Sequence, residues 1–319
     1  ASRGLGDVYK RQVFLGNIFQ QFYNIADSIV AGQFIGVKAL AAIGSTGSLM
    51  FFVTGWLNGL SSGFAILVSQ WFGAKQYDKM RHYVAMSVYL AGGCAVLMTA
   101  GLLIANEPIL RMMNYSAEIM PEVKQYMGII YAGLIVTAAY NSLAAFLRAI
   151  GDSKSPLYFL IISAVINVAL DVVFIVVFGM GVEGCAYATV IAQAISALLC
   201  FIYIVKKFPI LHLTKSDRKI SFQSFGRLLS LGIPMGLQFS ITAIGTIIVQ
   251  GAVNVYGETY MAGFSAAGKL QNMIMTVFVA FGATVATYVG QNRGAGRMDR
   301  VKSGVRCTQV MICLLYTSP

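Results

Sequence analysis

The chain has 319 residues, of which 57% are hydrophobic and 11% are charged, and its mean hydropathy is +0.73. A soluble chain is about 45–50% apolar and about 25% charged, so this composition argues against both a water-soluble globular enzyme and a disordered chain. It is the composition of an all-α polytopic membrane protein. The net charge of +11 does not indicate a nucleic-acid partner, because the basic residues of such apolar chains gather in cytoplasmic loops.

Apolar segments long enough to cross a bilayer recur along the whole chain. A spanning helix needs about 20 mostly apolar residues. Complete spans are predicted at 13–35, 45–70, 83–105, 125–147, 157–178, 184–205, 230–254 and 260–289, and a ninth begins near residue 304. The polar segment 1–12 and the last residues, 313–319, interrupt this pattern and resemble adapter-derived sequence. We therefore expect a fragment that is truncated at both ends.

Basic residues alternate from loop to loop. Sixteen of the 23 fall in one set of loops: Lys75, Lys79, Arg81, Arg148, Lys154, Lys206, Lys207, Lys215, Arg218, Lys219, Arg227, Arg293, Arg297, Arg300, Lys302 and Arg306. The opposite set holds only Lys38, Arg111 and Lys124, with Lys269 just inside a span. The positive-inside rule places the first set, and the N-terminus, in the cytoplasm.

The sequence contains an internal repeat. A shift of 221 residues aligns 36–84 with 257–305 without a gap, and eleven of the 49 positions are identical. The clearest block pairs Gln70, Gly73, Ala74 and Asp78 with Gln291, Gly294, Ala295 and Asp299. The two copies lie six spans apart, so we expect parallel repeats related by an axis along the membrane normal.

The repeat divides the chain into two halves. The first half comprises six helices at 13–206, and the second half, at 229–312, is cut after helices seven to nine begin. A basic segment at 207–228 is the expected cytoplasmic linker. An ordinary solvated connector explains its composition, and a regulatory or lipid-binding element is the alternative.

Two acidic residues lie well inside predicted spans, Asp27 in the first and Asp171 in the fifth. A central aspartate costs about 2.5–3.5 kcal/mol on insertion scales, and such residues usually mark ion or proton routes. Asn167 precedes Asp171 by four residues and shares its helix face, and Thr189 in the sixth span falls near the same depth. These oxygen ligands suit a hard cation such as Na⁺, and paired carboxylates suit proton uptake. The sequence does not choose between the two ions, and a purely structural hydrogen-bonding role is the alternative.

Further polar side chains lie in the spans, either lining a substrate pathway or joining helices by hydrogen bonds. The pathway candidates are Gln21, Tyr23, Asn24, Gln193 and Gln238. The five cysteines form no CxxC pair, and they are interpreted as small buried hydrophobes. No metal site is expected beyond the possible Na⁺ site, and no cofactor.

Several sequence segments together resemble a known transporter family. The segments QQFYNIADSIVAGQFIGVKALAAIG, QWFGAKQYDK, FLRAIGDSKSP, INVALD and GCAYATVIAQ, in this order, resemble the multidrug and toxic compound extrusion (MATE) family over essentially all of 13–312. The resemblance implies a two-lobe helical bundle, with a complete N-lobe and the first two to three helices of the C-lobe. It also implies a monomeric antiporter in the bacterial cytoplasmic membrane that exports cationic amphiphilic drugs in exchange for H⁺ or Na⁺. The family's N-lobe ion site matches Asp27, Asn167, Asp171 and Thr189.

In one feature this sequence differs from part of the family, and the difference favours one branch. Helix seven, in 230–254, contains no acidic residue, which favours the DinF-like branch, whose coupling relies on the N-lobe. A lipid-linked oligosaccharide flippase of the same superfamily is the alternative, although its cavity would need several cationic residues. A channel lacks the required pore-lining ring, and an enzyme lacks a nucleophile, base or metal cluster in the spans.

Overall fold

The computed structural model describes residue 30 and residues 32–113, 119–254, 278–279 and 281–317. All regular elements in this part of the chain are helices, as the composition predicts. Those of the first half are α2 (Val37–Ser45), α3 (Gly47–Gly73), α4 (Tyr77–Met112), α5 (Met120–Ala132), α6 (Leu134–Ala149), α7 (Lys154–Val172), the π-helix η1 (Val173–Val177) and α8 (Val182–Lys207). They are followed by the short η2 (Pro209–Leu211), α9 (Phe222–Asn254), a helical segment at 281–294 and α11 (Met298–Thr317).

Five helices in the described residues are long and apolar enough to span a membrane, and the bent pair α5 and α6 makes a sixth. The predicted spans at 45–70, 83–105, 157–178 and 184–205 each coincide with one of them. The predicted spans at 13–35 and 260–289 lie mostly outside the described residues. The chain is thus a multi-pass membrane protein.

The predicted span at 125–147 is two helices rather than one. The chain breaks at Gly133, and α5 and α6 meet at 47°. A Cβ atom on Gly133 would lie 2.4 Å from Cγ2 of Val190, so the glycine lets α8 approach the break closely. Hydropathy alone does not detect such a bend because the apolar stretch continues across it from α5 into α6.

Helix α9 begins at Phe222, eight residues before the predicted span and inside the segment expected to be linker. Its first six residues include Gln223, Ser224 and Arg227, which lower the hydropathy of this segment below that of a span. The hydroxyl of Ser221 accepts a hydrogen bond from the backbone N–H of Ser224 at 3.3 Å, which caps the helix. The non-helical or 3₁₀ connection between the halves is therefore 208–221.

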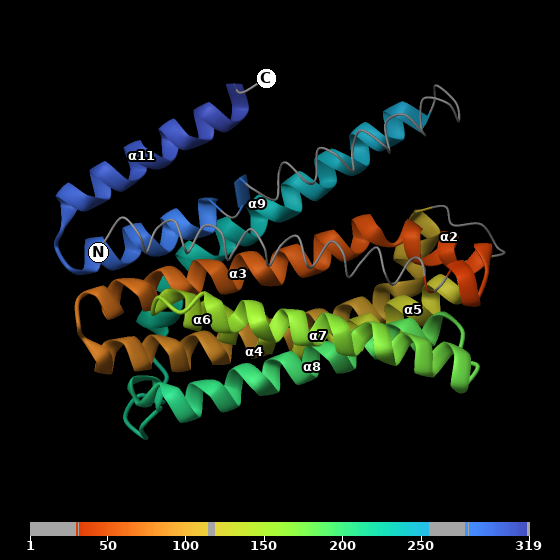
Figure 1. Cartoon of the computed structure of the whole chain (residues 1–319), viewed down its shortest axis with the longest axis horizontal. Coiled ribbons are helices and arrows are strands. Elements are labelled where there is room, and N and C mark those ends of the chain that lie inside the picture. Colours follow the sequence, from red (N-terminus) through yellow and green to blue (C-terminus); the bar gives the residue numbers. More distant parts are fainter. Residues whose placement is uncertain (1–29, 31, 114–118, 255–277, 280, 318–319) are drawn as a thin grey trace.

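The basic loops gather at one end of the bundle. In Figure 1 the α3–α4 and α6–α7 turns, the connection after α8 and the turn before α11 all lie at the left end. This is the arrangement that the alternating charge pattern predicts. Helix α3 is the most enclosed of the spans, with half of its most apolar window buried, and it packs against α4, α6 and α9.

The repeat predicted from the sequence is present as a repeated turn. The turn after α3 and the turn before α11 have the same hydrogen bonds, from Ala74 N–H to the Gln70 carbonyl at 2.9 Å and from Ala295 N–H to the Gln291 carbonyl at 3.0 Å. One residue further on, Lys75 has φ +57° and its counterpart Gly296 has φ +71°. The aligned polar block therefore encodes a helix C-cap with one left-handed residue.

The linker is anchored on α4 by polar contacts. Arg81 Nε donates to Oδ2 of the buried Asp217 at 3.0 Å, and the Thr214 hydroxyl donates to the same oxygen at 2.6 Å. His82 contacts the carbonyl of Asp217 through Nδ1 at 3.1 Å and Oγ of Ser224 through Nε2 at 3.0 Å. These contacts, which we call the linker anchor, show that the linker is not a freely solvated connector.

Burial by itself raises the pKa of the Asp217 carboxyl, but the hydrogen bonds from Thr214 and the Arg81 guanidinium outweigh it. The pKa of Asp217 is therefore lowered, and the residue is an anion at neutral pH.

Candidate functional site

The buried face of α7 is polar. Ser163, Asn167 and Asp171 follow one another at intervals of four residues, and the side chains of Asn167 and Asp171 are completely inaccessible to solvent. The opposite face is apolar, and Val165 is 65% exposed. A spanning helix with polar residues inside and apolar residues outside is solvated by lipid and directs its polar groups into the bundle.

Helix α8 packs against this polar face. The Ser163 hydroxyl donates to the carbonyl of Ala192 at 2.8 Å, and the Ser196 hydroxyl donates to that of Phe159 at 3.2 Å. Both bonds join a side chain of one helix to the backbone of the other. They require a close approach, which the small buried residues of α8 permit.

These two bonds define an antiparallel register. Continued by one turn from Ser163, the register places Asn167 at the depth of Thr189, which is also buried. Continued by a second turn, it places Asp171 opposite Gly184, at the start of α8. By this register Asn167 and Thr189 lie near one depth, and Asp171 lies one helical turn away along the same interface.

The helix changes its winding directly after Asp171. Residues Val173–Val177 form a π-helix, and the N–H of Phe178 donates to the carbonyl of Val173 at 3.1 Å. Short π segments are costly and are found frequently at functional sites. A Cβ atom on Gly184 would lie 3.1 Å from Cβ of Phe174, so the first turn of α8 fits closely against this segment.

Position distinguishes Asp171 from the other buried acid of the described chain. Asp217 lies in the linker beside Arg81, whereas Asp171 lies inside the bundle at the α7–α8 interface. Burying an ionised carboxylate inside a spanning bundle is costly. The oxygen atoms of Asn167, Asp171 and Thr189 are of the type that binds small hard cations.

The other predicted site residues have different fates. Asp27, Gln21, Tyr23 and Asn24 lie outside the described residues. Gln193 accepts a hydrogen bond from the Thr137 hydroxyl through its side-chain oxygen and so joins α8 to α6. Gln238 lies exposed on α9.

Sequence reasoning missed Ser163 and Thr137, although the spacing of four before Asn167 could have identified Ser163.

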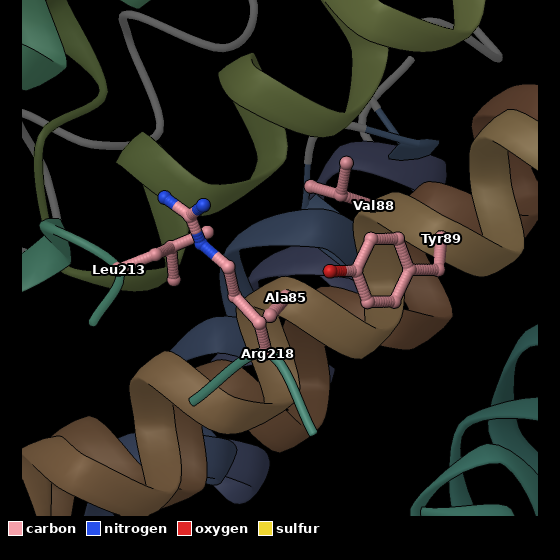
Figure 2. Close-up of a pocket in the computed structure, with 5 residues that line it drawn as sticks. All are labelled: Ala85, Val88, Tyr89, Leu213 and Arg218. Carbon is pink, nitrogen blue, oxygen red and sulfur yellow. The ribbon is translucent and has the colours of Figure 1, made fainter. Parts of the chain in front are cut away.

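No metal-binding group of three His, Cys, Asp or Glu side chains exists among the described residues. A groove on the outer face of the bundle lies between α4 and the linker, lined by Ala85, Val88, Tyr89, Leu213 and Arg218 (Figure 2). It holds about 220 Å³ and is open to one side, whereas drug-sized ligands occupy about 300–1,000 Å³. This groove is therefore smaller than a typical site for a drug-sized ligand.

Comparison with known proteins identifies the family. The MatE family profile matches residues 13–173 and 234–317. The probable multidrug resistance proteins YpnP and YoeA of Bacillus subtilis are 31% and 30% identical to this chain over 92% of its length. The chain spans 66% and 65% of these two relatives.

Solved structures agree on the fold. A MATE protein in the bent conformation has a TM-score of 0.90 and 21% identity, covering 98% of this chain and 70% of that protein. A multidrug resistance MATE transporter in an outward-facing conformation has a TM-score of 0.91 and 21% identity, covering 98% of this chain and 69% of that protein. The chain therefore belongs to the MatE family, that of the multidrug and toxic compound extrusion transporters.

Proposed function

We propose that the complete protein is a secondary antiporter that exports cationic amphiphilic compounds in exchange for H⁺ or Na⁺. The observation that carries this proposal is the burial of Asn167, Asp171 and Thr189 together at the α7–α8 interface. The names of the relatives, probable multidrug resistance proteins, support the cargo class. In this proposal Asp27 of the first span completes the ion site.

The mechanism follows from charge. With the cavity open to the outside, H⁺ or Na⁺ enters the cluster and neutralises Asp171, which lowers the cost of burying this side chain at the α7–α8 interface. Cargo is released in that state. The cavity then opens to the cytoplasm, where the ion dissociates and new cargo binds. Such coupling requires only that the ion binds the two states with different affinity.

The test uses the complete gene in a bacterium without its own drug pumps. We expect ethidium efflux by the wild type and a loss of at least about tenfold for Asp171→Asn and for Asp27→Asn, because a neutral amide cannot exchange the ion. Asp299→Asn is the matched control, since Asp299 is exposed and only 3.7 Å from Arg297. Dissipating the proton and sodium gradients separately then identifies the ion.

Two outcomes contradict the proposal. If Asp171→Asn pumps as fast as the control, the cluster is structural. If the wild type exports no cationic dye at matched expression, the cargo class is wrong. A more distant relative, at 22% identity, is named an FAD transporter, so nucleotide export is then the next assay.

A further inference from the structure

The two copies of the repeat touch each other at the basic end of the bundle. A Cβ atom built on Gly73 would lie 1.9 Å from the carbonyl oxygen of Gln291, and one built on Gly294 would lie 1.8 Å from that of Gln70. Non-bonded heavy atoms normally approach to about 3.5 Å. Only residues without a side chain allow these two backbones to meet.

The contact is reciprocal. The shift of 221 residues that aligns the repeats converts Gln70 into Gln291 and Gly73 into Gly294. Each glycine therefore lies against the glutamine carbonyl of the other copy, which is the pattern of a self-complementary contact across a two-fold axis. Such an axis runs between the C-terminal ends of α3 and the 281–294 helix.

Further glycines extend the contact. A Cβ atom on Gly290 would lie 2.0 Å from the Ser69 hydroxyl. Deeper in the bundle, one on Gly63 would lie 2.6 Å from the Gly232 Cα, and one on Gly59 would lie 2.5 Å from the Met235 carbonyl. The contact between α3 and α9 continues to Phe51 and Phe239, whose ring centroids lie 6.5 Å apart. Past Phe239, the rest of α9 runs away from α3 (Figure 1).

We propose that the contact of Ser69–Gly73 with Gly290–Gly294, the glycine seal, closes the cytoplasmic side of the transport cavity and must part for the cavity to open inward. The inference rests on the proposed transport function and on the positive-inside orientation. The same two segments carry the glutamine and the glycine of the polar block that both repeats share, and the ion site uses neither residue. The Gln291 side chain also donates to the Ala149 carbonyl at 2.8 Å, which places the seal on the end of α6.

An alanine in the seal acts on one state only. Its methyl group cannot be accommodated while the two backbones are in contact, because the atoms it meets are backbone atoms rather than flexible side chains. Once the segments part, the methyl group meets nothing and even favours helix. The substitution therefore shifts the population toward the inward-open state.

The first experiment measures the distance between the lobes in the complete protein. Spin labels are attached at the exposed positions Lys154 and Lys302, at the basic end of each half. For Gly73→Ala and Gly294→Ala we expect the ratio of short to long distances to fall about tenfold or more relative to the unsubstituted protein. Gly101→Ala and Gly245→Ala are the controls, because a Cβ atom at either helical position meets nothing within 4 Å. Unchanged distances in the variant that carries both Gly73→Ala and Gly294→Ala would overturn the proposal.

The second experiment does not depend on how well the alanine variants fold. The ideal Cβ position of Gly290 lies 3.2 Å from the Ser69 Cβ, close to the separation of about 3.5–4.5 Å in disulfides. In a cysteine-depleted complete protein, the pair Ser69→Cys with Gly290→Cys is expected to cross-link on oxidation and to stop efflux until it is reduced. If the cross-linked protein transports as fast as the same protein after reduction of the disulfide, the seal is refuted.

The two proposals fail separately. Distances respond to the seal whatever the cargo or the ion is, so they remain informative if ethidium is not exported. Conversely, Asp171→Asn could lose efflux while the glycine variants show no change in distance. That result would support the proposed transport function and reject the seal.

Discussion

The linker anchor and the glycine seal lie at the same end of the bundle but join its parts by different forces. The anchor consists of hydrogen bonds to a buried anion, from Arg81 and Thr214 to Asp217. The seal consists of glycine against backbone, at Gly73 and Gly294. The first contact depends on ion pairing and hydrogen bonding, and the second depends on close steric fit.

This difference indicates which contact is suited to open. Separating the anchor would leave a buried carboxylate and its partners unsatisfied, and that penalty keeps such a contact permanently closed. Separating two glycine-lined backbones removes mainly dispersion contacts, which other surfaces can replace. A transporter needs a reversible contact between its halves and a fixed one for the linker, and the two are built accordingly.

The largest loss of stability is expected where a new side chain would clash most severely with backbone atoms. Gly63→Leu introduces a side chain where a Cβ atom alone would lie 2.6 Å from two backbone atoms, so we expect a loss of about 3 kcal/mol or more of stability. A lowered midpoint of thermal unfolding in detergent measures it. Gly101→Leu, on an exposed face of α4, should leave the midpoint nearly unchanged. Equal midpoints for the two variants would show that the α3–α9 crossing is loose.

A smaller effect is expected at the anchor. Arg81→Ala removes the cation beside Asp217, whose side chain is only 7% exposed, and we expect a loss of about 2–3 kcal/mol in the closed linker. The linker should then be cut by trypsin faster at Lys215, Arg218 and Lys219. Arg111→Ala breaks an exposed pair with Glu107 and should change the cutting rate little. If Arg81→Ala is cut no faster than Arg111→Ala, the anchor does not hold the linker.

Acid should release the anchor only late. The folded-state pKa of Asp217 lies below its ordinary value of 3.8, so its stabilising contribution is complete above that value and is lost as the pH falls through the lower folded pKa. A spin label at Lys219 should loosen as the pH falls below about 3.8. Asp217→Asn should remove this acid transition. A transition below that pH that persists in Asp217→Asn would assign it to another group.

Much of this architecture is accessible from the sequence because lipid imposes simple rules. Span length, the alternation of charge and the cost of burying acids predict the helices, the end at which the basic loops gather, and the burial of Asn167 and Asp171 inside the bundle. The polar block at Gln70 and Gln291 likewise predicts the repeat.

What sequence reasoning missed depends on contacts between distant segments. The bend at Gly133 requires Val190 of α8, and the early start of α9 requires a cap from Ser221. Gly73 and Gly294 were recognised as repeated residues, but their opposition across an axis is a property of the folded bundle alone. Apolar composition makes such glycines common, so their number does not show which of them touch.

The smallest effect concerns the one feature in which the two copies of the turn differ. Lys75 adopts φ +57° where Gly296 adopts φ +71°, and a left-handed conformation costs a residue with a side chain about 1 kcal/mol. Lys75→Gly should therefore raise stability by about that amount, and Gly296→Lys should lower it similarly, since a Cβ atom at Gly296 meets nothing within 4 Å. Unfolding midpoints of the two variants, compared with each other, measure backbone strain without disturbing the seal. Equal midpoints would show that the copies do not share one turn geometry, and the two-fold relation behind the seal would lose its support.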